Sequence, residues 1–372
     1  MRLTNNHTSE RHLRPSLHFV QAINFELTYR CNMSCSHCLQ QEFRKINSRK
    51  WLSTELAKKA IKDAHHAGIT STGINFTGGE VFLPESNLPD LVETAQSLHV
   101  EVRINTNGWW GDQKNIRVGS RIFPSAKHIV SWLRDMDIAA LALSFDRRYE
   151  KASHLWHSVV SIIRECETQG QPYQVICTGV KPEEIIEGWY RLTEDEGINP
   201  QYLIPVEMEM IDIGGAAEQT QGSLQLETLA KAVRKTTCRG KGFFRPACLH
   251  ICPDGGVRTC LYSSGAGWLG NIYQKSLIQI IKEFPENCVV EAFSSNDYDF
   301  LIETFMEPHA HTYRSTRHPC AISAILSRVV EKYDLFEREQ GRKPKHEEQR
   351  LIHEQVAREL NLLIEMEYST TQ

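Results

Sequence analysis

The stretch that decides the fold is residues 23–38, which read INFELTYRCNMSCSHC. Its first part, Ile23–Thr28, is short and largely apolar, which predicts a β-strand. The second part, Cys31–Cys38, places three thiols within eight residues directly after that strand. Functional groups of parallel α/β sheets collect at the carboxyl ends of the strands. We therefore expect a thiol site at one edge of such a sheet.

From this strand the chain alternates between short apolar runs and amphipathic stretches up to about residue 215. The expected strands are Ile23–Thr28, Gly73–Phe76, Glu101–Asn105, Ile138–Phe145, Tyr173–Cys177 and Tyr202–Val206. The expected helices are Thr54–His66, Leu88–Leu98, Ser125–Met136, Leu155–Thr168 and Glu183–Thr193. Strand, crossover helix, strand is the pattern of a parallel sheet with right-handed connections. Six such units predict an α/β fold, a partial or full TIM-like barrel.

Composition excludes several classes of protein. The chain has 372 residues with 42 Lys+Arg against 46 Asp+Glu, a net charge of −4, so bulk charge does not hold it to nucleic acid or an anionic membrane. No signal peptide and no apolar membrane span is visible. The 11 cysteines are odd in number and too sparse for a disulfide scaffold. We expect a cytoplasmic protein with reduced cysteines, which points to metal binding or catalysis.

The spacing of Cys31, Cys35 and Cys38 is C-x3-C-x2-C. A short loop of this kind can wrap one corner of an iron–sulfur cluster, because each thiolate binds its own iron. Three ligands on a four-iron cube leave one iron open for a substrate. Zinc is the alternative, but it prefers four protein ligands and paired C-x2-C spacing.

This loop after the first strand of an α/β barrel resembles the radical S-adenosylmethionine (radical SAM) enzymes. The resemblance implies that Cys31, Cys35 and Cys38 bind a 4Fe-4S cluster, and that His37 occupies the adenine-contacting position. The run Thr77–Glu80 follows the second strand and resembles the family's GGE motif. There Gly78 and Gly79 let the backbone approach a ligand closely, and Glu80 is expected to accept from the ammonium group of SAM.

Further SAM contacts are expected at the tips of later strands. The resemblance places ribose and carboxylate contacts there, with Ser144 as first choice for the ribose and Asn105 and Asn107 as second. Turn formation and helix capping are the alternative roles of these polar residues. Arg147, or its neighbour Arg148, is expected to hold the SAM carboxylate, with a solvated surface position as the alternative. Gly214 lies in a small-residue segment that resembles one abutting SAM.

A second group of cysteines follows residue 224, where the alternation gives way to an expected helix, Leu224–Lys235, and a Cys-rich stretch. Residues 248–260, CLHICPDGGVRTC, resemble the opening hairpin of SPASM and Twitch domains, which bind auxiliary iron–sulfur clusters. The remaining SPASM segment, C-x2-C-x5-C-x3-C, is absent, so one auxiliary 4Fe-4S cluster is expected rather than two.

Hairpin geometry narrows the choice of auxiliary ligands. With a turn at Pro253–Gly256, Cys252 pairs near Val257 and Cys260 lies opposite about Leu249, next to Cys248. Cys252 is then about three residues, or roughly 10 Å, further along. The expected ligands are Cys238, Cys248, Cys260 and Cys320, with Cys252 and Cys288 as substitutes. A zinc site or free thiols are the alternatives.

These features divide the chain into three expected parts. Residues 18–215 form the radical SAM barrel, 216–325 a smaller α+β Twitch-like region, and 326–372 a helical tail. In the tail, residues 345–366 carry apolar side chains at helical spacing, which predicts an amphipathic helix packed on the domain. A dimer contact is the alternative.

The resemblance implies an enzyme that reductively cleaves SAM at the cluster to a 5′-deoxyadenosyl radical, which abstracts hydrogen from its substrate. We expect a peptide or natural-product substrate and a reducing partner such as flavodoxin or ferredoxin. A dehydrogenase or epimerase of sugar-like molecules is the first alternative, and a zinc-binding protein without SAM chemistry the second. No catalytic residue is assigned. Cys252 or Cys177 is a possible hydrogen-atom donor, although a buried free thiol is the default for Cys177 and Cys166.

Overall fold

The structure is a computed structural model that describes residues 20–47, 50–145, 154–179, 182–201, 204–209, 239–240, 243–244, 248–259, 267–290, 298–307, 309 and 319–360. Several predictions lie outside these residues: the contacts of Arg147, Arg148 and Gly214, the ligands Cys238 and Cys260, and the helix at 224–235. Cys320 lies within a helix, but its side chain is not described.

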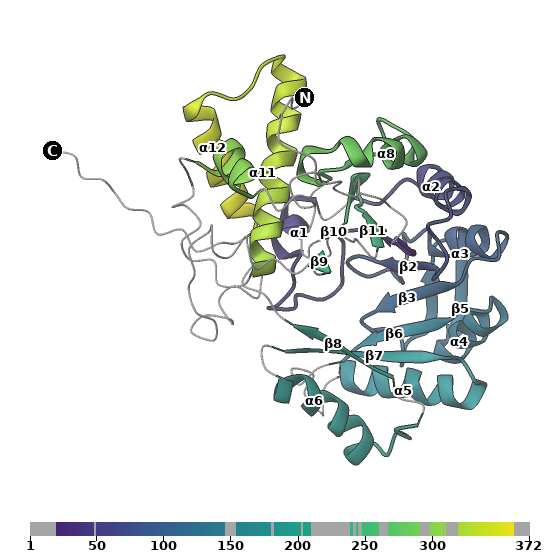
Figure 1. Cartoon of the computed structure of the whole chain (residues 1–372). Helices are drawn as coiled ribbons and strands as arrows, with labels where there is room; N and C mark the ends of the chain where they lie inside the picture. Colours follow the sequence, from purple (N-terminus) through teal and green to yellow (C-terminus); the bar gives the residue numbers. More distant parts are fainter. Residues whose placement is uncertain are drawn as a thin grey trace.

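The core of the fold is a parallel sheet of six strands that are neighbours in chain order (Figure 1). These strands are β1 (Ala22–Glu26), β2 (Ile74–Thr77), β3 (Val102–Thr106), β6 (Ala140–Ser144), β7 (Tyr173–Gly179) and β8 (Ile204–Glu209). The helices between them are α2 (Thr54–His66), α3 (Leu88–Gln96), α4 (Ala126–Asp135), α5 (His154–Gln169) and α6 (Pro182–Tyr190). The predicted α/β class is confirmed, and within the described residues the sheet is open.

The two faces of this sheet differ in chemistry because side chains alternate along a strand. One set, which includes Phe25, Phe76, Ile104 and Leu143, is buried in a hydrophobic cluster with residues of α2 to α5. Many of the alternate positions are polar, and they face the other way. They include Asn24, Asn75, Arg103, Asn105 and Gln174, and we call this side of the sheet the polar face.

The second cysteine region continues the same sheet. Strand β11 (Cys248–Ile251) pairs in parallel with β1, and β12 (Gly256–Arg258) and β13 (Gly270–Asn271) extend the edge to nine strands. The predicted hairpin exists, but its register is shifted by one residue. Ile251 pairs with Val257, and the Cys252 amide donates to the Gly256 carbonyl at 2.8 Å. The turn is therefore one residue shorter than the sequence suggested.

Several elements were not predicted. A separate antiparallel pair, β4 (Lys114–Val118) and β5 (Arg121–Ser125), precedes α4, and α1 (Gln41–Asn47) follows the cysteine loop. The remaining short elements are β9 (Arg239–Gly240), β10 (Phe243–Phe244), α8 (Leu277–Glu283), α10 (Tyr298–Leu301), the 3-10 turn η4 (Phe284–Glu286) and the π-helical turns η2 (Arg191–Asp195) and η5 (Ile302–Met306).

The C-terminal helices α11 (Pro319–Gln340) and α12 (His346–Glu359) form a second hydrophobic cluster with Tyr29 and Phe43. Ile352, Val356 and Leu360 are buried in it, as expected for a tail helix that packs on the domain.

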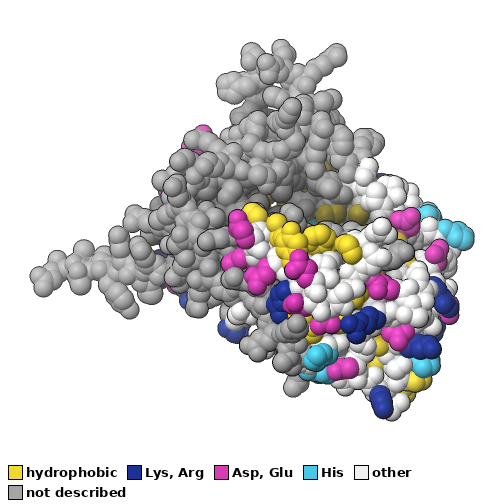
Figure 2. Space-filling view, turned by 90° about the horizontal axis from the view of Figure 1, so that it is seen from below, with side chains coloured by type: hydrophobic (Ala, Val, Ile, Leu, Met, Phe, Trp, Pro, Cys, Tyr) yellow, Lys and Arg dark blue, Asp and Glu magenta, His cyan; other side chains and the backbone are white. Residues whose placement is uncertain are grey.

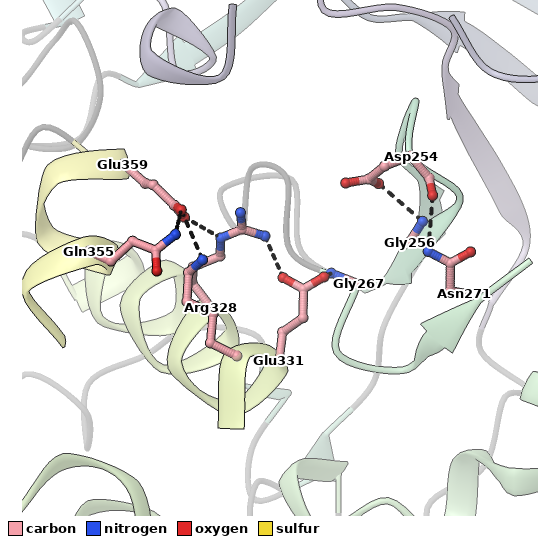
Figure 3. A network of polar contacts seen from close by, with 9 residues as sticks. Asp254, Gly256, Gly267, Asn271, Arg328, Glu331, Gln355 and Glu359 are labelled. Atoms are coloured by element: carbon pink, nitrogen blue, oxygen red, sulfur yellow. Dashed lines mark hydrogen bonds and ion pairs between the residues drawn. The ribbon is translucent and has the colours of Figure 1, made fainter. Parts of the chain in front are cut away.

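Ion pairs connect helices α11 and α12 (Figure 3). Arg328 of α11 pairs with Glu331 and with Glu359, the latter at 2.7 Å. Glu331 also accepts from the Gly267 amide at 2.8 Å. This ion network therefore connects α11 and α12 to the segment that leads into β13.

On the side seen in Figure 2, Lys and Arg side chains are interspersed with Asp and Glu. None of the helices in the described ranges has the length and apolar character needed to cross a membrane.

A buried ion pair joins β1 to the hairpin. Arg258 of β12 is fully buried and pairs with Glu26 of β1, whose second carboxylate oxygen accepts from Gln40 at 3.0 Å. We expect Arg258→Leu to lower the free energy of unfolding by about 3–5 kcal/mol, because Glu26 is left charged and buried. Urea denaturation would measure this. The double variant Glu26→Leu/Arg258→Leu should recover part of the loss, and equal destabilisation of both variants would contradict the account.

Candidate active site

The cysteine loop lies directly beyond the carboxyl end of β1, where the sequence places it. Cys31, Cys35 and Cys38 are each half-buried, so a ligand can reach their thiols. A turn forms where the Cys38 amide donates to the Cys35 carbonyl at 3.2 Å, and α1 then begins at Gln41. No three His, Cys, Asp or Glu side chains of the described residues converge to hold one metal ion.

Asn107, at the tip of β3, holds the start of the loop. Its Nδ2 donates to Asn32 Oδ1 at 2.9 Å and lies 3.6 Å from Cys31 Sγ. The Met33 amide points at the same sulfur from 3.4 Å. The sequence marks Asn107 as a SAM contact. The structure gives its side chain a role the sequence does not reveal, which is to position Cys31.

The GGE motif, which follows β2, is hydrogen-bonded to the segment that leads into the cysteine loop. The Gly79 amide donates to the Thr28 carbonyl at 2.6 Å, and the Glu80 amide to the Arg30 carbonyl at 2.8 Å. A Cβ at Gly79 would meet the Arg30 carbonyl oxygen at 1.9 Å, and one at Gly78 the Thr28 oxygen at 2.6 Å. Glycine is therefore required here by close approach of the protein's own backbone, and the approach to a ligand expected from the sequence remains a prediction.

Glu80 is fully buried and bonds to the loops after β2 and β3. Its Oε1 accepts from Thr106 Oγ1 at 2.8 Å and from the Phe82 amide at 2.9 Å, and its Oε2 accepts from the Asn107 amide at 2.8 Å. Thr106 has no signal in the sequence analysis, since its role depends on a contact 26 residues away. The ammonium contact expected of Glu80 remains a prediction.

The buried state of Glu80 makes the stability of the apoprotein depend on pH. Burial raises the pKa of Glu80 from 4.5 to about 7, against the lowering effect of its hydrogen bonds. The folded state favours the protonated acid. The stabilisation that the protonated Glu80 gives to the folded state is therefore complete below pH 4.5 and is lost as pH rises through 7. We expect the free energy of unfolding to fall by roughly 3 kcal/mol between pH 5 and pH 8.

Chemical denaturation at several pH values measures this change. Glu80→Gln cannot titrate and should remove this part of the pH dependence, whatever its absolute stability. A slope that is identical in the two proteins between pH 5 and pH 8 would contradict the assignment of the pKa.

Residues proposed to contact SAM fit a polar cofactor at this end of the sheet. Asn105 is on the polar face of β3, and its Oδ1 is buried without a hydrogen-bond partner. Ser144 ends β6, and His37 lies in the turn between Cys35 and Cys38. Three separate thiols are the donor set of a cluster corner, and an unpartnered amide acceptor suits a ligand that brings donors.

The described auxiliary candidates lie in different surroundings. Cys248 begins β11 in register with Ala22 at the start of β1, and its Sγ is 3.1 Å from His250 Nε2. Burial lowers the pKa of His250 to about 4, so the ring is neutral at pH 7. Cys252 is four residues further on, roughly 13 Å at strand rise. Cys288 is half-buried against the second hydrophobic cluster.

The two possible hydrogen-atom donors differ in position. Cys177 of β7 belongs to the hydrophobic cluster on the helix side of the sheet, and Cys166 is buried in the same cluster. Cys252 follows β11 at the end of the sheet that carries the cysteine loop. Burial, with Asp254 and Glu331 nearby, raises the pKa of Cys252 well above its usual value, so the thiol stays protonated.

Comparison with known proteins relates part of this chain to one superfamily. Residues 25–151 match the family model of the radical SAM superfamily. The chain is 28% identical over 134 residues to the putative peptide biosynthesis protein YydG of Bacillus subtilis, over 34% of this chain and 36% of that protein. It is 34% identical over 86 residues to the mycofactocin maturase MftC of Mycolicibacterium smegmatis, over 23% of this chain and 21% of that protein.

The matched segments thus span about a third or less of these two curated relatives. Among solved structures, Streptococcus suis SuiB bound to S-adenosylmethionine is similar at a TM-score of 0.40 and 11% identity, over 76% of this chain and 66% of that one.

Proposed function

We propose that this chain, which carries a radical SAM superfamily domain over residues 25–151, is an enzyme that modifies a peptide by abstracting a hydrogen atom. The observation that carries the proposal is the loop of Cys31, Cys35 and Cys38 at the carboxyl end of β1, braced by the GGE motif. The names of YydG and MftC, a peptide biosynthesis protein and a maturase, support the peptide class.

When bound, SAM and a 4Fe-4S cluster would supply one-electron cleavage of a sulfonium C–S bond, which yields methionine and a 5′-deoxyadenosyl radical. Cys31, Cys35 and Cys38 would each bind one iron and leave the fourth open. Asn107 orients Cys31 through Asn32, while Asn105 and Ser144 would bind the nucleoside.

The chain's further task is to exclude water from the reacting carbon. Helices α2 to α5 cover one side of the sheet with a hydrophobic cluster. The polar face lies on the opposite side of the sheet, and we expect the substrate to bind there. Asn105 and Ser144 lie near the carboxyl ends of the strands on this face. The cysteine loop follows the carboxyl end of β1, so a substrate on the polar face would lie along the strands next to that end. It would be within reach of a nucleoside bound there.

One auxiliary 4Fe-4S cluster is part of this proposal. Cys248 is half-buried and near the neutral His250, and Cys238, Cys260 and Cys320 would complete the ligand set, with Cys252 as a substitute. If Cys252 is not a ligand, its protonated thiol is available as a hydrogen-atom donor. A low-potential flavodoxin or ferredoxin would supply electrons.

Co-expression tests the peptide class. The protein would be produced together with each short peptide encoded beside its gene, and the recovered peptides analysed by mass spectrometry in H2O and in D2O. We expect one peptide to gain a crosslink, an oxidation or a deuterium only when the enzyme is present. If every peptide returns unchanged while a sugar-like metabolite is converted, the dehydrogenase or epimerase alternative replaces the proposal.

A further inference from the structure

A row of polar residues crosses the polar face at one level of the sheet. Asn24 of β1 pairs with Asn75 of β2, which pairs with Arg103 of β3. In the other direction Asn24 pairs with His250 of β11, which pairs with Arg258 of β12. The row therefore carries two arginines, one near each end, on the side of the sheet opposite to helices α2 to α5.

The two arginines differ in their partners. Arg258 is neutralised by Glu26 in a buried ion pair. Arg103 has no ion pair or hydrogen bond with any described residue, and its buried Nε is without a partner. Burial alone lowers the pKa of Arg103, and no acidic group raises it. A half-buried guanidinium without an anion is unfavourable for folding.

Two amide oxygens without a partner among the described residues lie on the same face, one on the strand next to Arg103 and one two strands away at the level of Asn105. Asn75 Oδ1, on the neighbouring strand, and Gln174 Oε1, on β7, are both buried and lack a hydrogen-bond donor. Between Arg103 and Gln174, strand β6 presents only the methyl groups of Ala140 and Ala142. Among the described residues, this face thus offers one cation that lacks an anion and two acceptors that lack N–H or O–H donors.

This group adjoins the expected cofactor contacts, because Asn105 lies two residues beyond Arg103 on the same face of β3. Asn107, which touches Cys31, follows the end of β3 four residues beyond Arg103, roughly 13 Å at strand rise. A ligand held by Arg103 would therefore extend away from the cysteine loop along the polar face. That length corresponds to a few residues of an extended peptide.

We propose that Arg103 binds a carboxylate of the substrate, while the amide oxygens of Asn75 and Gln174 accept from its backbone N–H groups. This inference rests on the proposed function and adds the substrate class, a peptide with an acidic side chain or a free C-terminus near the reacting residue. A guanidinium is suited to this task because its parallel N–H donors match a carboxylate bidentately.

Thermal unfolding separates this role from a structural one. Arg103→Gln removes a charge that has no partner, so its melting temperature should equal or exceed that of the unaltered protein. A structural arginine would behave in the opposite way, and a clear fall in melting temperature would overturn the inference.

Binding is tested with three short peptides: Ac-Gly-Asp-Gly-NH2, the matched Ac-Gly-Asn-Gly-NH2, and Ac-Gly-Gly-Gly-OH, which carries only a terminal carboxylate. Titration followed by NMR should give at least about tenfold tighter binding of one carboxylate peptide than of the Asn peptide, because a charged hydrogen bond is lost. Whether Asp or the free C-terminus binds better identifies the source of the carboxylate.

Arg103→Gln should abolish this preference and Arg103→Lys should retain part of it. The control Arg134→Gln, at an exposed helix position, should bind like the unaltered protein. Equal binding of all three peptides, or binding of none, overturns the inference. SAM cleavage without peptide is measured on the same samples. Its presence with no carboxylate preference refutes only this inference, whereas its absence refutes the proposed function.

Discussion

The variant Cys31/Cys35/Cys38→Ala is expected to form no detectable 5′-deoxyadenosine from SAM under reducing, anaerobic conditions. The three half-buried thiols are the donor set of the loop beyond β1, and a cluster corner without thiolates has no anchor. Liquid chromatography of the quenched reaction measures the product. Cys166→Ala, which removes a thiol from the hydrophobic cluster on the helix side of the sheet, is the control and should retain cleavage.

Iron analysis of the same variant reports on the second cysteine group. A residual content of about four irons per chain would support one auxiliary 4Fe-4S cluster, and the absence of residual iron would refute it. Equal 5′-deoxyadenosine formation in the triple variant and the unaltered protein would refute the assignment of the loop.

Gly79→Ala is the second variant for which we expect a large effect. The new Cβ would lie 1.9 Å from the Arg30 carbonyl oxygen and 2.5 Å from its carbon. Backbone cannot yield as a flexible side chain does, so the GGE loop and the cysteine loop must separate. The hydrogen bonds from the Gly79 and Glu80 amides to Thr28 and Arg30 would then be lost.

We expect this variant to lose SAM cleavage and to be destabilised by several kcal/mol, about the cost of overpacking a core plus two buried hydrogen bonds. Denaturation and product analysis measure the two effects. The control is Gly170→Ala, where nothing lies within 4 Å of the added Cβ, so only its backbone conformation is disfavoured. Full activity in Gly79→Ala would contradict the bracing role of the motif.

The sequence predicts the sheet well because its signal is local. Each of the six strands is a short segment with apolar residues at alternate or consecutive positions, and the helix predicted at Thr54–His66 has the observed bounds. The pair β4–β5 was missed, because each strand has only five residues and apolar residues alternate only at Ile116 and Val118. The hairpin register was off by one residue, since the turn at Pro253–Gly256 does not fix which residue pairs first.

The site was predictable only in part. The cysteine loop and the GGE motif can be recognised in the sequence by their residue types and spacing. Glu80 accepts hydrogen bonds from Thr106 and Asn107. The folded sheet brings these two residues to Glu80, and no spacing rule reveals them. The unpaired charge of Arg103 is likewise invisible in a sequence, because it depends on which acids the fold brings near.

The central claim is that the cysteine loop binds a cluster that cleaves SAM. The most direct test is to reconstitute the protein anaerobically with iron and sulfide, reduce it, add SAM and measure 5′-deoxyadenosine together with bound metals. The account predicts bound iron with absorbance of an iron–sulfur cluster, and equal amounts of 5′-deoxyadenosine and methionine. A protein that holds zinc in place of iron and forms no 5′-deoxyadenosine would contradict it.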